Sequence, residues 1–473
     1  MSRLVLFVSD RVGWEKYLKP LVEKPLPSDL GWTVTLGSVS VLLFVLEVVT
    51  GMFLAMYYNP SPDHAYQSID YIMKDVHMGW ILRGIHHWGA GAMVVVVFVH
   101  MVSTFFQGAF KPPRELTWIV GVFLFLMTLG FGFTGYLLPW DQKAFWATVV
   151  GTNIPKDIPV IGEFLTRVLL AGDRVSGLTL SRFYSIHTLI LPSLMFLLTV
   201  FHIYLVRIHD IAPPAASNRS ENPNPSDKKT PHRFFPEHLF KCAIAFVFVF
   251  TLILLLSIFA EIPREDIAGT IDPTYLPRPE WYYMWLFQLL TFFTGSAEII
   301  GSLAIPVGTV LFLFFLPFLS KSPLRSPADR PIATSIGVAC LVGIIYLTMM
   351  GIGNSRPYGD IIVIPDRKLT RVEKKGLNVF VERECAYCHH ILGKGGRREG
   401  PDLSNVIEKD RTKDWLLKFI KDPQATSSWS IMPKYDLSEE ELNALVEFIL
   451  SLDFHHHGSK MISRREIIDG NDF

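Results

Sequence analysis

Cysteine is scarce in this chain, with only four among 473 residues. Cys242 and Cys340 lie in or beside apolar segments, where a free cysteine usually packs as a small hydrophobic residue. Cys385 and Cys388 stand together in one C-x-x-C pair. The cysteines therefore exclude a fold that depends on a disulfide framework.

Net charge is also missing, because 44 lysines and arginines balance 44 aspartates and glutamates. No nucleic acid is expected as a partner, since such binding usually requires an excess of positive charge. Half of the residues are hydrophobic, and the mean hydropathy is +0.31. For a chain of this length, the composition indicates a polytopic membrane protein with some soluble mass.

Long apolar runs supply the membrane part. A helix of about 20 residues crosses a bilayer. The opening run Leu4–Val8 is too short for the core of a secretory signal and is followed by charged residues, so residues 1–30 are expected to form an uncleaved interfacial segment. Seven spans are expected, near residues 33–57, 80–106, 115–136, 184–206, 239–260, 299–319 and 331–351.

Basic residues mark alternate connections between these spans. By the positive-inside rule these connections face the cytoplasm, and the tail after residue 352 is then external. A polar linker, 207–238, separates the first four spans from the last three. The basic residues are Lys16, Lys19, Lys24, Lys111, Arg114, Arg207, Arg219, Lys228, Lys229, Arg233, Lys321, Arg325 and Arg330.

Four histidines lie on two of the spans at similar intervals. His86 and His100 are 14 residues apart, and His187 and His202 are 15 apart. Both intervals are close to whole helical turns and correspond to about 21 Å, so each helix presents two imidazoles on one face at two depths. One such histidine alone is often structural, but the matched pairs favour two stacked haems, each held by two histidines.

Span direction assigns the pairs, because spans two and four both run inward in this topology. His86 and His187 then share the outer level, and His100 and His202 share the inner level. The neighbouring spans repeat the interval in glycine, a residue that is unfavourable inside a helix unless something approaches its backbone. Helix packing explains any one of these glycines, whereas the shared 14-residue period favours a porphyrin edge. They are Gly37, Gly51, Gly121 and Gly135.

The tail carries the sequence Cys385-Ala386-Tyr387-Cys388-His389. In a C-x-x-C-H motif the two thiols form thioethers to a haem and the histidine binds its iron. Redox and zinc sites also use C-x-x-C pairs. The adjacent histidine, the external location and the helical sequence that follows favour a covalent c-type haem here.

The sixth iron ligand of this haem is expected to be Met432, in Ile431-Met432-Pro433. Met461 lies beyond the last expected helix, near 437–452. His390 is too close to His389 to reach the opposite haem face. A short histidine run, which either binds a metal or belongs to a solvated tail, is formed by His455, His456 and His457.

Four short motifs carry a family resemblance: Trp88 after His86-His87, the segments 135–142 and 181–188, and the Pro279-Glu280-Trp281-Tyr282 loop. Over about residues 30–351 the chain closely resembles cytochrome b of the quinol:cytochrome c reductases. The 15-residue interval, the linker and the seven spans resemble the photosynthetic branch, where a four-helix cytochrome b and a three-helix subunit IV are separate chains. Here the two are fused to a monohaem cytochrome c.

The resemblance implies an all-α fold, a polytopic membrane helical bundle followed by a small α-helical cytochrome c domain. Four of the seven transmembrane helices would form a dihaem bundle. The expected domains are an interfacial segment (1–30), a four-helix dihaem domain (31–210), a cytoplasmic linker (211–238), a three-helix domain with the quinol-oxidation loop (239–352) and an external cytochrome c domain (353–473).

The family also implies a function and partners. Quinol would be oxidised near the outer face of the cytoplasmic membrane, with one electron passing to a Rieske iron-sulfur protein and the other to two b-type haems. A soluble or membrane cytochrome would be the acceptor, and a homodimeric complex is expected. A dihaem membrane anchor that does not split the electron pair, and a transporter without haem, are the alternatives from other classes.

Family roles fall on the outer loop first. Glu280, in a Pro-flanked turn, would accept protons from quinol, and a plain surface carboxylate is the alternative. Pro279, Trp281 and Tyr282 would complete the loop. Other parts of the pocket, each of which simple packing also explains, would be Tyr136, Pro139, Trp140 and Phe145.

Arginines near the haem levels have two interpretations. Arg83 and Arg182 would pair with propionates of the outer haem, or they reach lipid headgroups. At the inner quinone site Arg207, His209 and Asp210 are proton donors or propionate partners, although positive-inside charge explains Arg207 equally well.

A covalent third haem is not expected in the membrane part. The photosynthetic branch carries a cysteine on the first span that attaches an extra haem beside the inner site. Thr35 stands at that position here, and residues 1–241 contain no cysteine.

Overall fold

The computed structural model describes most of the chain as two compact units. The first comprises Met1–Pro139, Leu180–Arg264 and Val307–Val342, and the second comprises Trp140–Thr179, Glu265–Pro306 and Gly343–Phe473. The described residues are 7, 9, 11, 13–27, 30–213, 232–268, 278–293, 297, 299–320, 322–353, 361–394, 400–427, 430, 432–455 and 458–468. Predictions that lie outside them concern Arg219, Lys228, Lys229, Lys321, His456, His457 and most of the linker.

Seven helices in the described part of the chain are long and apolar enough to cross a membrane, as predicted. Inside a bilayer each main-chain polar group must bond within its own segment, which favours continuous helices. The fourth begins earlier than expected, at Gly177. They span Trp32–Ala55, Gly79–Phe106, Glu115–Tyr136, Gly177–His209, Phe234–Phe259, Ile300–Leu319 and Pro331–Gly353.

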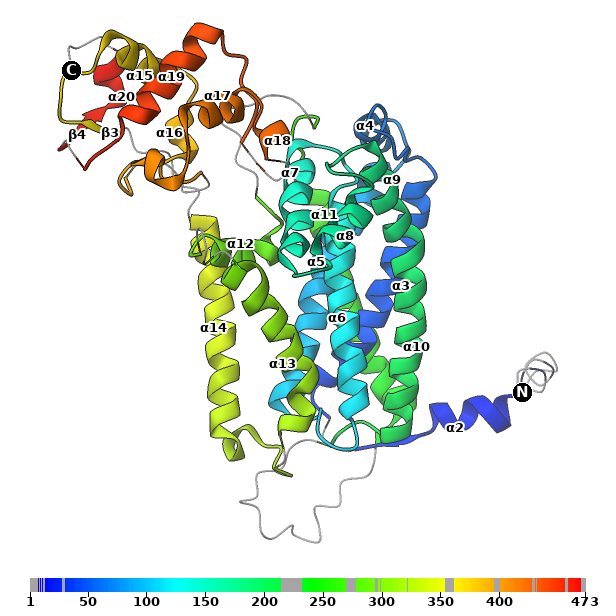
Figure 1. Ribbon diagram of the computed structural model, residues 1–473. Coiled ribbons are helices and arrows are strands. Elements are labelled where there is room, and N and C mark those ends of the chain that lie inside the picture. The colour runs from blue at the N-terminus through cyan, green and yellow to red at the C-terminus, as the bar shows by residue number, and fades with distance from the viewer. Residues whose placement is uncertain are drawn as a thin grey trace. The chain divides into compact units, whose positions relative to one another are not determined.

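Long parallel and antiparallel helices form the first unit (Figure 1). Helix α5 packs against α3, α6 and α11, and α10 packs against α6. Buried Leu43, Met93, Met195 and Ile253, one from each of α3, α5, α10 and α11, share one core cluster. The bounds are α3 (Leu36–Ala55), α5 (Gly79–Phe106), α6 (Glu115–Tyr136), α10 (Leu191–His209), α11 (Leu239–Phe259), α13 (Ile305–Leu319) and α14 (Pro331–Gly353), the last of which belongs to the second unit from Gly343 on.

Shorter elements complete the first unit. Strand β1 (Pro25–Leu26) pairs antiparallel with β2 (His232–Arg233), which ties the N-terminal region to the start of the fifth span. The other elements are η1 (Trp14–Leu18), α2 (Lys19–Val22), η2 (Trp32–Thr35), α4 (Ala65–Lys74), α9 (Gly177–Ser185), η4 (Ile186–Ile190), η6 (Phe234–His238) and η10 (Pro327–Asp329).

Three of the basic connections meet within this unit. Lys111 donates to the carbonyl of Leu324 at 2.6 Å, and Arg325 donates to the carbonyl of Pro213 at 2.8 Å. Arg114 caps the end of α10 through the carbonyl of His209 at 3.0 Å. The connections after the second, fourth and sixth spans therefore lie at one end of the helices, as alternation of the spans requires.

Short helices form the part of the second unit that precedes the C-terminal domain in the sequence. Helix α7 begins at an Asp141 N-cap, whose carboxylate accepts from the Ala144 amide at 2.8 Å. The elements are α7 (Gln142–Asn153), η3 (Ile154–Asp157), α8 (Gly162–Leu170), η7 (Trp281–Tyr283), α12 (Met284–Leu290) and η9 (Ile300–Ala304).

The C-terminal part of the second unit has its own hydrophobic core. Capping boxes start its two main helices, at Thr370 for α15 and at Ser438 for α19. The helices cross closely at Gly376, where a Cβ would overlap the carbonyl of Ala444. The elements are β3 (Ile361–Pro365), α15 (Arg371–Glu382), α16 (Cys385–Cys388), η11 (Val406–Lys409), α17 (Lys413–Lys421), α18 (Pro423–Thr426), α19 (Glu439–Ser451), β4 (Ser459–Ser463) and α20 (Arg464–Ile468).

The sequence did not predict one feature of this part, which is the antiparallel pairing of β3 with β4. The register joins Ile361 to Ser463 and Pro365 to Ser459. Buried Ile362, Val363 and Ile364 of β3 join the core. The small domain is therefore mostly helical, as predicted, with one antiparallel pair of strands.

Candidate functional site

The outer histidines lie together in the first unit. The ring centroids of His86 and His187 are 6.3 Å apart, with an interplanar angle of 78°. Nδ1 of His86 is 2.9 Å from the hydroxyl of Thr50, and Nδ1 of His187 is 3.0 Å from that of Thr134. With both Nδ1 atoms engaged, both Nε2 atoms remain for a metal.

This spacing fits one iron between the two rings. Two ligand nitrogens about 2 Å from a shared metal lie about 4 Å apart. Their ring centroids lie further apart by the distance from each nitrogen to its ring centre, which is consistent with 6.3 Å. Two facing imidazoles are a donor set that suits the iron of a haem.

The four glycines each lie against one imidazole. A Cβ at Gly135 would stand 2.6 Å from Cε1 of His187, and a Cβ at Gly51 would stand 3.2 Å from Cε1 of His86. The corresponding inner distances are 3.3 Å from Gly37 to His100 and 3.4 Å from Gly121 to His202. The glycines thus leave room for the ligands themselves, a role that their period did not reveal. A porphyrin contact stays a prediction.

The unequal histidine intervals have a structural reason. His187 lies in η4 (Ile186–Ile190), a π-helical turn that continues into α10. A π-turn accommodates one residue more than an α-turn. It takes up the extra residue of the 15-residue interval, so His187 and His202 keep a common face, as His86 and His100 do across 14 residues of α5.

The surroundings of the three candidate arginines differ. Arg83 lies 3.4 Å from the sulfur of Met73. Arg207 stacks over Phe234 at 4.7 Å. Arg182 is exposed at the end of α9. Their propionate contacts stay predictions.

Near the predicted inner quinone site, a lysine that sequence reasoning missed holds the end of α10. Lys24 pairs with the carboxylate of Asp210 at 2.5 Å and donates to the carbonyl of Arg207 at 2.8 Å. Thr35, at the position where the photosynthetic branch carries its haem-attaching cysteine, is buried and donates to the carbonyl of Trp32 at 2.7 Å.

In the second unit, the outer loop holds Glu280 in an ion pair. Its Oε1 atom is 3.1 Å from Nζ of Lys143 on α7, and both side chains are mostly buried. Pro279 leads into the turn, and Trp281 is half-exposed and packs edge-on against Tyr282 at 5.4 Å. Burial, with smaller contributions from Tyr283 and Glu280, raises the pKa of Tyr282 well above its usual value.

Two main-chain bonds fasten the start of α7 to the segment before the loop. The Gln142 amide donates to the carbonyl of Asp266 at 2.9 Å, and the Ala268 amide donates to the carbonyl of Trp140 at 3.0 Å. Trp140 has a left-handed φ of 53° and packs edge-on against Phe145 at 6.0 Å. Two of the predicted pocket aromatics therefore lie together. Tyr136 and Pro139 belong to the first unit.

The C-x-x-C-H motif forms the short helix α16 and the residue after it. Nδ1 of His389 is 2.9 Å from the carbonyl of Pro401, which leaves Nε2 for iron. A Cβ at Gly400 would stand 2.5 Å from this ring. Burial raises the pKa of the Cys385 thiol to about 12. Attachment of a haem through Cys385 and Cys388 stays a prediction.

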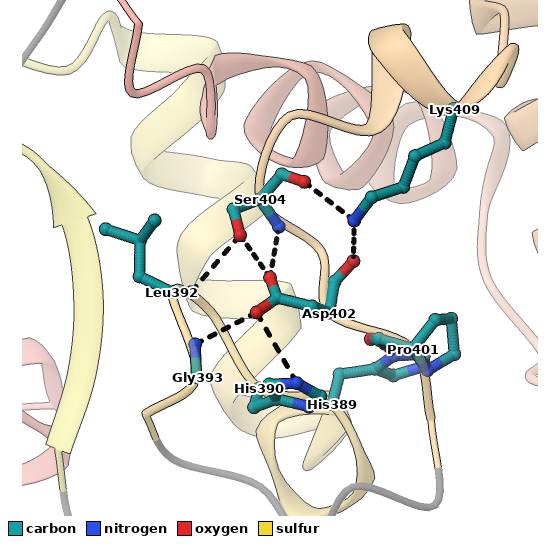
Figure 2. A network of polar contacts seen from close by, with 8 residues as sticks. All are labelled: His389, His390, Leu392, Gly393, Pro401, Asp402, Ser404 and Lys409. Carbon is teal, nitrogen blue, oxygen red and sulfur yellow. Dashed lines mark hydrogen bonds and ion pairs between the residues drawn. The ribbon is translucent and has the colours of Figure 1, made fainter. Parts of the chain in front are cut away.

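A polar network fixes the chain on both sides of this histidine (Figure 2). Asp402 accepts from the amides of Gly393 at 2.9 Å and Ser404 at 2.8 Å and from the Ser404 hydroxyl, and lies 3.4 Å from Nε2 of His390. Burial opposes ionisation of Asp402, but these bonds outweigh it and lower the pKa of the carboxyl. Lys409 joins the network through the carbonyls of Asp402 and Ser404.

The other candidates in the tail are also placed. Met432 is partly buried against the core that Cys385 contacts, and its role as sixth ligand stays a prediction. Met461 is exposed on β4. His455 bonds Glu408 at 2.8 Å.

Comparison with known proteins matches three successive family models along the chain. Cytochrome b/b6/petB matches residues 21–210, Cytochrome b(C-terminal)/b6/petD matches 273–364, and Cytochrome c matches 373–453. A cytochrome bc complex cytochrome b subunit from Chlorobaculum thiosulfatiphilum is 35% identical over 347 residues, which cover 71% of this chain and 79% of the relative. The chain belongs to the cytochrome b family.

Other members of the cytochrome b family show how the parts combine. Cytochrome b6 of Heliobacterium modesticaldum is 40% identical and covers 43% of this chain with 95% of its own length. Cytochrome b/c1 of Bradyrhizobium diazoefficiens is 32% identical over 74% of this chain and 50% of its own length. A structure titled "Hyperthermophilic respiratory Complex III" superposes with a TM-score of 0.66 and 27% identity, covering 75% of this chain and 92% of that one.

Within this cytochrome b, sequence reasoning missed several residues that contact predicted site residues. Thr50 and Thr134 each directly precede one of the predicted glycines, so a repeated Thr-Gly pair could have indicated them. Lys143 directly follows the Trp140-Asp141-Gln142 segment, as a cation among aromatic residues. Glu47 is an acidic residue within the first span, a position that is costly in a bilayer and usually functional.

Proposed function

We propose that this chain is the core subunit of a quinol:cytochrome c oxidoreductase that oxidises quinol at an outer site and contributes to the proton motive force. One electron of each pair would pass to a Rieske iron-sulfur protein and the other to two b haems. The observation that carries the proposal is the outer imidazole pair, 6.3 Å apart with both Nδ1 atoms engaged.

Haem ligands would come from both units. His86 with His187, and His100 with His202, would each hold one non-covalent b haem, and Cys385, Cys388, His389 and Met432 would hold a covalent c haem. When bound, the haems supply one-electron transfer. The protein residues fix the ligand rings, through Thr50 and Thr134 in the membrane and through the carbonyl of Pro401 in the C-terminal domain.

Glu280 would accept a proton from quinol. A general base must lie within reach of the proton that it accepts, and the ammonium of Lys143, 3.1 Å away, holds the Glu280 carboxyl in place. Movement of Glu280 away from Lys143 would then carry the proton outward. The buried phenol of Tyr282 borders the carboxyl and stays protonated at neutral pH.

Location and partners follow from the loop charges. The basic connections would face the cytoplasm, so the C-terminal domain would lie on the external side of the cytoplasmic membrane. A tethered domain has a high effective concentration near the outer face. It would receive electrons from the Rieske protein and deliver them to a soluble or membrane cytochrome, in a complex expected to be homodimeric.

A test is the isolation of the native complex, followed by difference spectra and mass spectrometry. We expect b and c haems at a ratio of about two to one. We also expect that a Rieske protein co-purifies with the chain and that the complex reduces cytochrome when quinol is supplied. A complex with both haem types but no Rieske partner would favour the dihaem anchor. Absence of haem would disprove both and leave the transporter.

A further inference from the structure

A carboxyl group reaches the outer histidine pair from inside the first membrane span. Oε2 of Glu47, on α3, is 3.1 Å from Nδ1 of His86, and its side chain is only 13% exposed. Oε1 is buried and has no hydrogen-bond partner among the described residues. On α5, a Cβ at Gly89 would overlap Oε1, so the glycine provides the space that this carboxyl occupies.

The other half of the histidine pair has the same framework without the carboxyl. On α3 the order is Glu47, then Thr50 and Gly51, and both latter residues contact His86. On α6 the same offsets give Phe131, Thr134 and Gly135, and the latter two contact His187.

The two halves therefore differ at one position. The Phe131 ring lies 5.5 Å from the ring of His187, where Glu47 meets His86. Four residues before the inner glycines the sequence has Thr33 and Thr117, so the carboxyl is specific to one of four ligands.

Packing alone is a poor explanation for this residue. Burying an ionisable group in a membrane costs several kcal/mol, and Phe131 shows that an apolar side chain fits the equivalent position. A carboxylate that accepts from the outer N–H of a ligating histidine fixes the ring and makes the opposite nitrogen a better electron donor.

We propose that Glu47 is a positioning residue that orients His86 and lowers the reduction potential of the haem held by His86 and His187. The inference rests on the haem ligation proposed above. The inner haem's ligands have no carboxyl at the equivalent positions. A lower reduction potential at the outer haem therefore increases the potential difference between the two haems, which favours electron transfer inward.

The test is a redox titration of the b haems in membranes that carry the full chain with Glu47→Gln. Glutamine keeps the shape and removes the charge. We expect the reduced-to-oxidised ratio of the outer haem at fixed ambient potential to rise about tenfold, equivalent to about 59 mV for one electron, and the inner haem to titrate as before. Glu115→Gln, a carboxyl at the opposite end of α6, is the matched control and should shift neither haem.

An unchanged outer midpoint in Glu47→Gln with both b haems present would overturn the proposal. If that variant loses the outer haem, Glu47→Asp keeps the carboxyl but withdraws it from His86 by one methylene. A smaller upward shift is then expected, and no shift would again overturn the proposal. His86→Ala separates the two levels of inference. Retention of both b bands there would show that the ligand pairing, rather than the role of Glu47, is wrong.

Discussion

The two haem-binding regions of this cytochrome b are built in opposite ways. In the first unit the predicted ligands come from separate helices, and each imidazole contacts a threonine or glycine of yet another helix, as His187 does Thr134 and Gly135. In the C-terminal domain Cys385, Cys388 and His389 are contiguous, and the network around Asp402 lies within the next 20 residues. The site in the first unit should lose its haem when one residue is replaced. The site in the C-terminal domain should keep its haem and change only in a property such as its reduction potential or spectrum.

Loss of one ligand tests this contrast most strongly. His86→Ala or His187→Ala should remove the outer b haem and stop quinol oxidation, because only two protein ligands hold it. His389→Ala should leave the c haem attached, since two thioethers remain. Haem-stained gels and difference spectra measure both, and c haem loss in His389→Ala would remove the contrast.

The outer loop is a distributed site as well, because Glu280 and Lys143 are 137 residues apart. Glu280→Gln should slow quinol oxidation by about 10²-fold, the scale of a lost general base, with haem content unchanged. Lys143→Met should also slow it, because the carboxyl loses the ion pair that holds it in place. An unchanged rate and pH profile in both variants would point to a proton acceptor elsewhere.

Met432→Ala addresses the contiguous site. The haem should stay covalently bound, but its potential should fall, because a thioether ligand favours ferrous iron. Reduction of the external cytochrome should then slow while the b haems are still reduced rapidly. Potentiometry of the c band is the direct measurement, and Met461→Ala is the control, since Met461 is exposed on β4. A potential that falls in the control alone would reassign the ligand.

Glycine substitutions offer a matched pair. A Cβ would stand 2.6 Å from the ligand ring at Gly135 and 2.5 Å at Gly400. Gly135→Ala should lower outer b haem occupancy, whereas Gly400→Ala should tilt His389 and change the c haem spectrum without loss of haem. Equal haem retention in the two variants would argue that the bundle adjusts as easily as the small domain.

The smallest effect is expected at Asp402. Its pKa is lowered in the folded state, so its contribution to stability is present above the unfolded value of about 4 and is lost as pH falls through the folded value. Asp402→Asn should cost the C-terminal domain about 1 kcal/mol at neutral pH and less at acid pH. Denaturation followed at the c haem band in the full chain measures this, and a pH-independent difference would contradict the assignment.

Much of the fold could be read from local pattern. Seven apolar runs became seven helices, because a bilayer leaves the backbone no other way to satisfy its polar groups. The C-x-x-C-H motif lies on one helical turn because its spacing is local. The β3–β4 pair could not be expected, since its strands are about 100 residues apart and Met461 and Ile362 carry no pairing signal of their own.

By itself, the sequence determined the family, the membrane class and the identity of the candidate haem ligands, since each depends on residue type and helical period. Only the tertiary structure decided which groups meet those ligands. The π-turn that carries His187, the Lys143–Glu280 pair and the approach of Glu47 to His86 depend on how separate segments pack. The partner of a side chain across a helix interface depends on the rotation and the crossing angle of the two helices. Neither can be predicted from the spacing of residues along one segment.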